Sequence, residues 1–384
     1  MNARPDLRIA DILRRHGEDF LRDEAVTPAQ ARALRLMMIC RTPALGGHLD
    51  LCDDCGHTRP SYNSCRDRHC PSCQAAAQHA WVTRRMERVL PTHHFHVVFT
   101  LPADLRVVAR YNPALVYGLL LRAAARTLLD LSRSRRHAQP GVTAVLHTWT
   151  RELLFHPHVH CIVTGGGLSE DGRTWVSTPK TFLFHVNVLR ARFSSLVRQG
   201  LRAALDDGDL RVDDPDALRR LLRALRCKRW VVYCKQPFAG PEHIYRYLGR
   251  YTHRVGISDP RLVAITDGEV TFRTRGTDRV TLTHREFIRR LLTHVLPSGF
   301  HKIRQYGLYA GANVHTRLMQ ARGALPPPPA PAEPAAKTGL EAFEEALTTC
   351  PACGGNHLRR VEIPRPQGRD LRRLLDGPRQ RGSP

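Results

Sequence analysis

The sequence predicts an α+β protein with a ferredoxin-like antiparallel sheet as its core, preceded by helices and a small cysteine-rich zinc module. Two observations predict this fold class. Strand-like and helix-like segments follow one another in the order βαββαβ through the middle of the chain, and cysteines gather in C-x-x-C pairs near its beginning. The 384 residues, 42% of them apolar, can bury a sizeable core.

Each element follows from its own pattern. Residues 6–25 and 27–41 carry apolar side chains at helical spacing, and Pro28 stands where a first helical turn tolerates proline, so two helices should precede the zinc module. The core elements alternate between β-branched or aromatic runs and amphipathic runs. They are a strand at 93–105, a helix at 112–133, strands at 141–150 and 156–166, a helix at 186–205 and a strand at 228–234.

An excess of basic residues predicts a polyanionic partner. Lysine and arginine number 59 against 35 acidic residues, a formal charge of +24. Arginine's planar guanidinium suits phosphate oxygens, so nucleic acid is the expected partner. No apolar run approaches the roughly 20 residues that span a membrane, and the N-terminal segment is charged throughout, unlike a secretory signal. We therefore expect a cytoplasmic protein without membrane association.

The eleven cysteines favour metal binding over disulfides, because they cluster and a cytosol keeps thiols reduced. Two C-x-x-C pairs lie at a spacing typical of zinc ribbons, in which each pair turns two thiolates towards one tetrahedral ion. The predicted ligands of a structural Zn²⁺ are Cys52, Cys55, Cys70 and Cys73. Cys65 and His69 lie inside the loop and could replace or join a ligand, so this set depends on spacing alone.

Three histidines alternate in the segment FHPHVHCIVTGGG, residues 155–167. Side chains two apart share a face of a strand, so His156, His158 and His160 could all point the same way, which is a metal-ligand geometry. The alternative is that backbone hydrogen bonds satisfy them. The three glycines that follow either allow a phosphate to approach closely or form a tight turn.

Two tyrosines stand four residues apart further along the chain. Pro241 suits the first turn of a helix and Gly256 its end, which puts Tyr247 and Tyr251 on one helical face. Tyrosines at this spacing are usually core or interface residues. Gly249 between them would instead let a phosphate come close, which a purely structural helix has little need of.

These features resemble the rolling-circle transposases of the insertion sequence 91 family, which are HUH endonucleases of the two-tyrosine type. The resemblance rests on the His-Val-His motif at 158–160, the downstream tyrosine pair and the upstream cysteine module. It extends over residues 45–315 through segments such as FHVVFTLP, WVVYCKQPF and FHKIRQYGL.

The resemblance implies a bacterial, nucleoid-associated DNA strand transferase that cleaves and rejoins single-stranded DNA at element ends. Tyr247 or Tyr251 would attack the phosphodiester to form a 5′-phosphotyrosine, with Mg²⁺ or Mn²⁺ at the histidines. Single-stranded or hairpin ends would be the substrates, duplex DNA would bind nonspecifically, and a homo-oligomer is possible. A replication initiator or relaxase with the same chemistry, or a non-enzymatic zinc-containing DNA-binding protein, are the alternatives.

The third ligand of that divalent ion is left open. Glu152 keeps strand parity with His158 and His160 and brings an oxygen donor, although the proline between them could break the strand. His156 and His147 are the alternatives.

The predicted organisation has four regions. They are helices plus the zinc module at 1–94, the HUH nuclease domain at 95–318, a Pro/Ala-rich linker at 319–340 and a basic tail at 341–384. The end of the tail is expected to be disordered. Cys350 and Cys353 in this tail form half of a zinc ribbon, which His357 or an upstream cysteine could complete.

Overall fold

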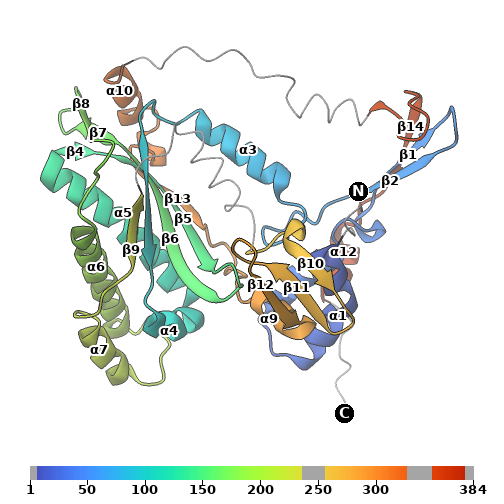
Figure 1. Cartoon of the computed structure of the whole chain (residues 1–384), viewed down its shortest axis with the longest axis horizontal. Helices are drawn as coiled ribbons and strands as arrows, with labels where there is room; N and C mark the ends of the chain where they lie inside the picture. Colours follow the sequence, from blue (N-terminus) through green and yellow to red (C-terminus); the bar gives the residue numbers. More distant parts are fainter. Residues whose placement is uncertain (1–6, 236–255, 327–347, 377–384) are drawn as a thin grey trace. The chain divides into compact units, whose positions relative to one another are not determined.

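The computed structural model describes residues 7–235, 256–326 and 348–376 (Figure 1). Its elements form two units, which we call the sheet unit (75–257 and 293–328) and the cysteine unit (1–74, 258–292 and 329–384). Each unit draws on separate stretches of chain, so the two units do not follow the contiguous regions expected from the sequence. Residues 258–292, expected in the nuclease domain, belong to the cysteine unit.

The sheet unit is built on five antiparallel strands. Their order across the sheet is β13 (Ile303–Gly307), β5 (Gly141–Trp149), β6 (Phe155–Thr164), β3 (His94–Thr100) and β9 (Val232–Lys235). With helices α5 (Pro113–Arg136) and α6 (Val186–Asp206), the chain runs β3-α5-β5-β6-α6-β9. These four strands stand in the spatial order fourth, first, third, second, so the ferredoxin-like prediction is confirmed. Strand β13 is an additional edge strand.

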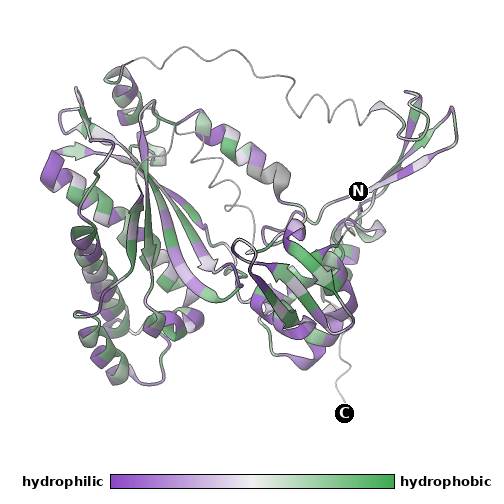
Figure 2. Cartoon of the chain, viewed as in Figure 1, coloured by the Kyte–Doolittle hydropathy of each residue, from purple (hydrophilic) through white to green (hydrophobic). Residues whose placement is uncertain are grey.

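One face of this sheet forms the core of the unit. Alternate residues of the central strands, such as Phe99, Leu146 and Val159, are buried with apolar side chains of α5 and α6. Figure 2 shows hydrophobic and hydrophilic residues mixed along α6 and α7 (Pro215–Ala224), as expected of helices with one buried side. Since strand side chains alternate, the other residues of the same strands must face the opposite side.

That opposite side is partly covered by α3 (Ala75–Met86), whose Trp81 packs with Val145 and Ile162. The unit's shorter elements are η2 (Ala103–Leu105), α4 (Arg106–Tyr111), β4 (Ala138–Gln139), β7 (Gly166–Ser169), β8 (Trp175–Ser177), η4 (Gly311–Asn313) and α10 (Arg317–Gly323). Strands β4, β7 and β8 form a small sheet of their own. A Cβ on Gly167 would lie 2.7 Å from the backbone of Gln139. The glycine run therefore serves close backbone packing here.

The cysteine unit contains helices and two three-stranded sheets. The helices are α1 (Ile9–Asp23), α2 (Pro28–Met38), α9 (His284–Leu292) and α12 (Gly368–Asp376), with η1 (Pro43–Leu45) and η3 (Asp259–Arg261). The two helices expected near the N-terminus are confirmed, and a Thr27–Gln30 capping box starts α2. One sheet is formed by β10 (Leu262–Ile265), β11 (Glu269–Arg273) and β12 (Arg279–Thr283).

The second sheet joins two distant parts of the chain. Strand β1 (Gly47–Cys52) pairs on one side with β2 (Thr58–Tyr62) and on the other with β14 (Leu358–Ile363), both antiparallel. The end of the tail, expected from its sequence to be disordered, thus contributes to a strand and contains the helix α12. Its strand forms because β1 supplies the partner, which a local sequence pattern cannot reveal. None of the helices within the described ranges has the length and apolar character needed to cross a membrane.

Candidate metal centres

Three histidines converge on the face of the sheet opposite the α5 and α6 core. His147 on β5 lies directly opposite His158 on β6 in the strand register, and His160 is two residues further along. Strand side chains alternate between the two faces of a sheet, and apolar residues such as Leu146 and Val159 face the core. All three histidines therefore lie on the opposite face. The ligand nitrogens of the three rings lie within 4.8 Å of one another. We call this group the histidine trio.

Hydrogen bonds orient two rings of the trio. Nδ1 of His158 lies 2.6 Å from the carbonyl oxygen of His156, to which it must donate, so the lone pair of His158 is on Nε2. Nδ1 of His160 lies 2.8 Å from Nε2 of His96 on β3. Metal-binding histidines are commonly held in this way through their second ring nitrogen. His96 was not among the residues expected at this site, although the sequence carries a signal for it. In HHFHVVFT, histidine alternates with apolar residues as it does around His158 and His160.

Burial keeps the trio neutral. It lowers the pKa of His158 to about 4, and it lowers the pKa values of His147 and His160 well below their ordinary value. Neutral imidazole is the form that binds a metal ion, so no proton need be displaced at pH 7. Three neutral nitrogen donors within reach of one point fit a divalent transition ion.

Glu152, the expected third ligand, does not join the trio. It is exposed in the turn between β5 and β6, where the amide of Leu153 donates to Thr150 O at 3.1 Å. The strand register shifts after His147, so the parity that would have aligned Glu152 with His158 is lost. His147, one of the alternatives, occupies the third position.

The other histidine alternative has a different contact. His156 lies outside the trio, and its Nδ1 is 2.7 Å from a guanidinium nitrogen of Arg106. Tyr247 and Tyr251, the expected nucleophiles, lie outside the described residues.

The ends of the segment that holds both tyrosines are described, however. Lys235, just before it, pairs in register with His96. Gly256, just after it, lies against Trp149, whose Cγ would be 3.3 Å from a Cβ at that position. The Trp149 ring stacks on His147 with centroids 4.8 Å apart. Both ends of the segment are therefore adjacent to residues that contact the trio.

The cysteines form two clusters rather than the single site expected. The structure divides the predicted set, because Cys52 and Cys55 do not meet Cys70 and Cys73. In each cluster the four sulfur atoms lie within 4.8 Å of one another. The first cluster is Cys40, Cys65, Cys70 and Cys73, and the second is Cys52, Cys55, Cys350 and Cys353. Spacing identified the C-x-x-C pairs correctly but could not show which pairs meet.

In the first cluster Cys65 is a member and His69 is not. Sγ of Cys65 lies 3.6 Å from Sγ of Cys73, whereas the ring of His69 bonds Asp67 at 3.0 Å. Hydrogen bonds among the four thiols lower the pKa values of Cys40 and Cys73 and raise those of Cys65 and Cys70, so thiolate and thiol forms stabilise one another in the cluster. Cys40 lies just after α2 and is not part of a C-x-x-C pair, so the local sequence did not identify it as a ligand.

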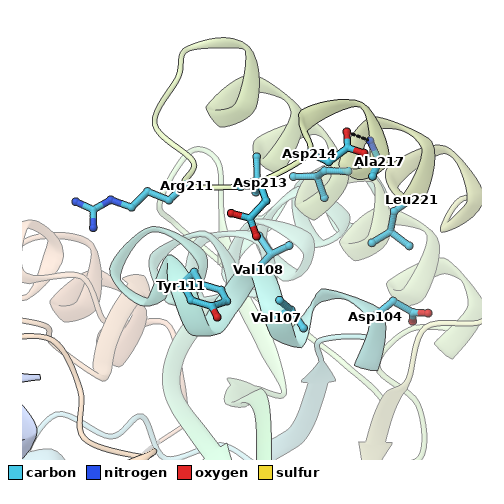
Figure 3. A pocket seen from close by; sticks show the side chains of 11 residues that line it. Asp104, Val107, Val108, Tyr111, Arg211, Asp213, Asp214, Ala217 and Leu221 are labelled. Carbon is cyan, nitrogen blue, oxygen red and sulfur yellow. Dashed lines mark hydrogen bonds between the residues drawn. The ribbon is translucent and has the colours of Figure 1, made fainter. Parts of the chain in front are cut away.

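A cavity of about 500 Å³ lies elsewhere on the sheet unit, between α4 and α7 (Figure 3). Val107 and Tyr111 form part of its apolar lining. Its charged lining residues are Asp104, Arg211, Asp213 and Asp214. Three carboxylates against one guanidinium, which points away from the cavity in Figure 3, make this a poor site for a phosphate.

A basic chain that combines a ferredoxin-like sheet, a histidine trio and two four-cysteine clusters has the features of a metal-binding protein that processes nucleic acid. Residues 12–101 match the family model "Transposase zinc-binding domain", and residues 141–317 match the model "Putative transposase". The chain belongs to the insertion sequence 91 family of transposases.

Two relatives carry this assignment. The "Putative transposase y4qJ" of Sinorhizobium fredii is 46% identical over 383 residues, covering 94% of this chain and 96% of that one. The "Transposase for insertion sequence element IS801" of Pseudomonas savastanoi pv. phaseolicola is 31% identical over 306 residues, covering 76% of this chain and 73% of its own. No solved structure matches. The family makes this protein a DNA-processing enzyme, and the matched zinc-binding domain and cysteine clusters support bound Zn²⁺.

Proposed function

We propose that this transposase cleaves and rejoins single-stranded DNA at the ends of its element through a 5′-phosphotyrosine, beside a divalent ion held by His147, His158 and His160. The histidine trio is the observation that carries the proposal: three neutral imidazoles, one buried and two half-buried, whose ligand nitrogens lie within reach of one point. Of the two ions expected, Mn²⁺ suits an all-nitrogen donor set better than Mg²⁺, which prefers oxygen ligands. When bound by these three histidines, such an ion would polarise the scissile phosphate and offset charge on the leaving oxygen.

The chain's own groups carry out the transfer. The phenol of Tyr247 or Tyr251 gives up its proton and its oxygen forms a bond to phosphorus, while the bond from phosphorus to the 3′ oxygen breaks and that oxygen takes up a proton. One proton is released and one is taken up, so the step is balanced. The energy of the phosphodiester is kept in the phosphotyrosine, so a free 3′-OH can reverse the step. Lys235 and Gly256, the described residues that flank the tyrosines in the sequence, lie next to residues that contact the trio, which supports this assignment.

Two tyrosines suit strand transfer because one can hold the first cleaved strand while the other attacks a second. The formal charge of +24 provides electrostatic binding to the DNA backbone. Only one strand can present its phosphate to an ion and a phenol at close range, which favours single-stranded or hairpin ends as substrates.

An adduct assay tests the proposal. The full chain is incubated with Mn²⁺ and a single-stranded oligonucleotide carrying an element end, then denatured. We expect a covalent adduct whose DNA is attached to Tyr247 or Tyr251. The double variant Tyr247→Phe/Tyr251→Phe and the variant His158→Ala should form none, while Tyr111→Phe, altered at an exposed tyrosine on α4, should match the wild type.

The outcome separates the alternatives. Duplex binding without any adduct in the wild type would favour a non-enzymatic DNA-binding protein. An adduct that persists in the double tyrosine variant would show that another residue is the nucleophile.

A further inference from the structure

The first C-x-x-C of the second cysteine cluster has the form of a zinc knuckle. The amide of Cys52 donates to the carbonyl of His57 at 2.9 Å, and the amide of Gly56 donates to the carbonyl of Cys52 at 2.9 Å. Gly56 has φ of 72°, a left-handed conformation that suits glycine. This turn brings the Cys52 and Cys55 thiols to one side.

The C-terminal C-x-x-C repeats that turn bond for bond. The amide of Cys350 donates to Gly355 O at 2.7 Å, the amide of Gly354 donates to Cys350 O at 2.9 Å, and Gly354 has φ of 76°. The same offsets and the same left-handed glycine occur in both segments, although the two are about 300 residues apart. Two equivalent turns that face each other are the arrangement of a zinc ribbon.

The sulfur positions match a tetrahedral ion. Sγ of Cys52 lies 3.7 Å from Sγ of Cys353, and Sγ of Cys55 lies 3.8 Å from Sγ of Cys350. With Zn–S bonds of about 2.3 Å, the edge of a tetrahedron is about 3.8 Å. A disulfide would require about 2.05 Å.

Strand pairing holds the two turns together. Cys52 is in register with Leu358 across β1 and β14, and the amide of Asp53 donates to His357 O at 2.9 Å. This sheet has little core of its own, because four of the six residues of β14 are exposed. A small sheet without a hydrophobic layer is marginal in water, so a bound ion is a physically reasonable source of its stability.

We propose that Cys52, Cys55, Cys350 and Cys353 bind a second structural Zn²⁺, distinct from the one at Cys40, Cys65, Cys70 and Cys73. Half of its ligands lie outside both regions that match the family models, which end at residues 101 and 317. This ion joins the C-terminal tail to the β1–β2 hairpin and completes a ribbon assembled from the two ends of the chain.

Differential alkylation tests the second zinc site without any substitution. Cys55, Cys353 and Cys227 are all exposed, and Cys227 belongs to neither cluster, so it is an internal control. The zinc-replete full chain, kept under a phosphine reductant to exclude disulfides, is treated with N-ethylmaleimide and mapped by mass spectrometry. We expect Cys227 to react quickly and Cys55 and Cys353 slowly, with the difference abolished by a chelator.

Metal content provides a second test. Cys353→Ser should bind one Zn²⁺ fewer per chain than the wild type, and Cys227→Ser should bind the same amount. Reaction of Cys55 and Cys353 at the rate of Cys227 in the zinc-replete chain would overturn the proposal. Unchanged zinc content in Cys353→Ser would overturn it too.

Discussion

The contact with His96 determines which ring nitrogen of His160 faces the other two histidines of the trio. Nε2 of His96 lies 2.8 Å from Nδ1 of His160, so we expect His96→Ala to weaken Mn²⁺ binding by about 10- to 100-fold, as removal of such a supporting contact usually does. His96→Gln, whose amide can still bond Nδ1, should retain more affinity. Calorimetric titration with Mn²⁺ measures both, and His185→Ala at an exposed position is the control. Equal affinity in all three variants would remove His96 from the site.

Two buried histidines outside the trio should make the sheet unit acid-sensitive. Burial lowers the pKa of His94 and of His294 to about 4, from an ordinary value of 6.5. The unfolded chain therefore takes up protons below pH 6.5 that the folded chain takes up only near pH 4. Stability is fully present above pH 6.5 and is lost as the pH falls through this window, by up to about 1.4 kcal/mol per pH unit for each histidine.

Denaturant unfolding at several pH values checks this acid sensitivity. Fluorescence of Trp149, whose ring centroid is 5.9 Å from that of His294, reports on the region. His294→Gln should show a shallower loss of stability below pH 6.5 than the wild type, and His185→Gln should not. An unchanged slope in His294→Gln would contradict the assignment.

The glycine run after β6 matters for the packing of elements, because it leads into β7, which pairs with β4. Because a Cβ at Gly167 would lie 2.7 Å from the Gln139 backbone, Gly167→Ala should destabilise the sheet unit by about 1–3 kcal/mol through overpacking. Gly311→Ala, which meets nothing within 4 Å, should be near neutral. Denaturant midpoints measure both. If Gly167→Ala kept its stability but lost DNA cleavage, the glycines would instead be needed to let a DNA phosphate approach the backbone closely.

The elements that the sequence predicted well are those whose signal is local. Helical periodicity located α5 and α6, and β-branched runs located β3, β5 and β6. The features that the sequence did not predict depend on contacts between distant residues. Strand β14 forms by pairing with β1, and Cys40 joins a cluster only because the fold brings it to Cys70 and Cys73. His147 was only an alternative because a register shift in the β5–β6 pair is invisible in the spacing of residues.

At the scale of the whole molecule, the two units should be separable in function. Cys70→Ser removes a ligand of the first cysteine cluster and should disrupt the cysteine unit, while the trio and its sheet lie in the other unit. We expect this variant to lose discrimination between element ends and random duplex, measured by competition binding. It should still form adduct on a short single strand. Parallel loss of both activities would show that the units act together.

The second cysteine cluster has a consequence for biosynthesis. Cys55 and Cys350 are 295 positions apart, so at 5–20 residues per second the ribosome needs roughly 15–60 s to supply the second half of the site. During that interval Cys52 and Cys55 form an open dithiol on a nascent chain. A coding sequence interrupted before the codon for Cys350 gives a protein in which this dithiol is never closed. Completion of the ribbon thus distinguishes a chain that extends through Cys353 from one that ends before it.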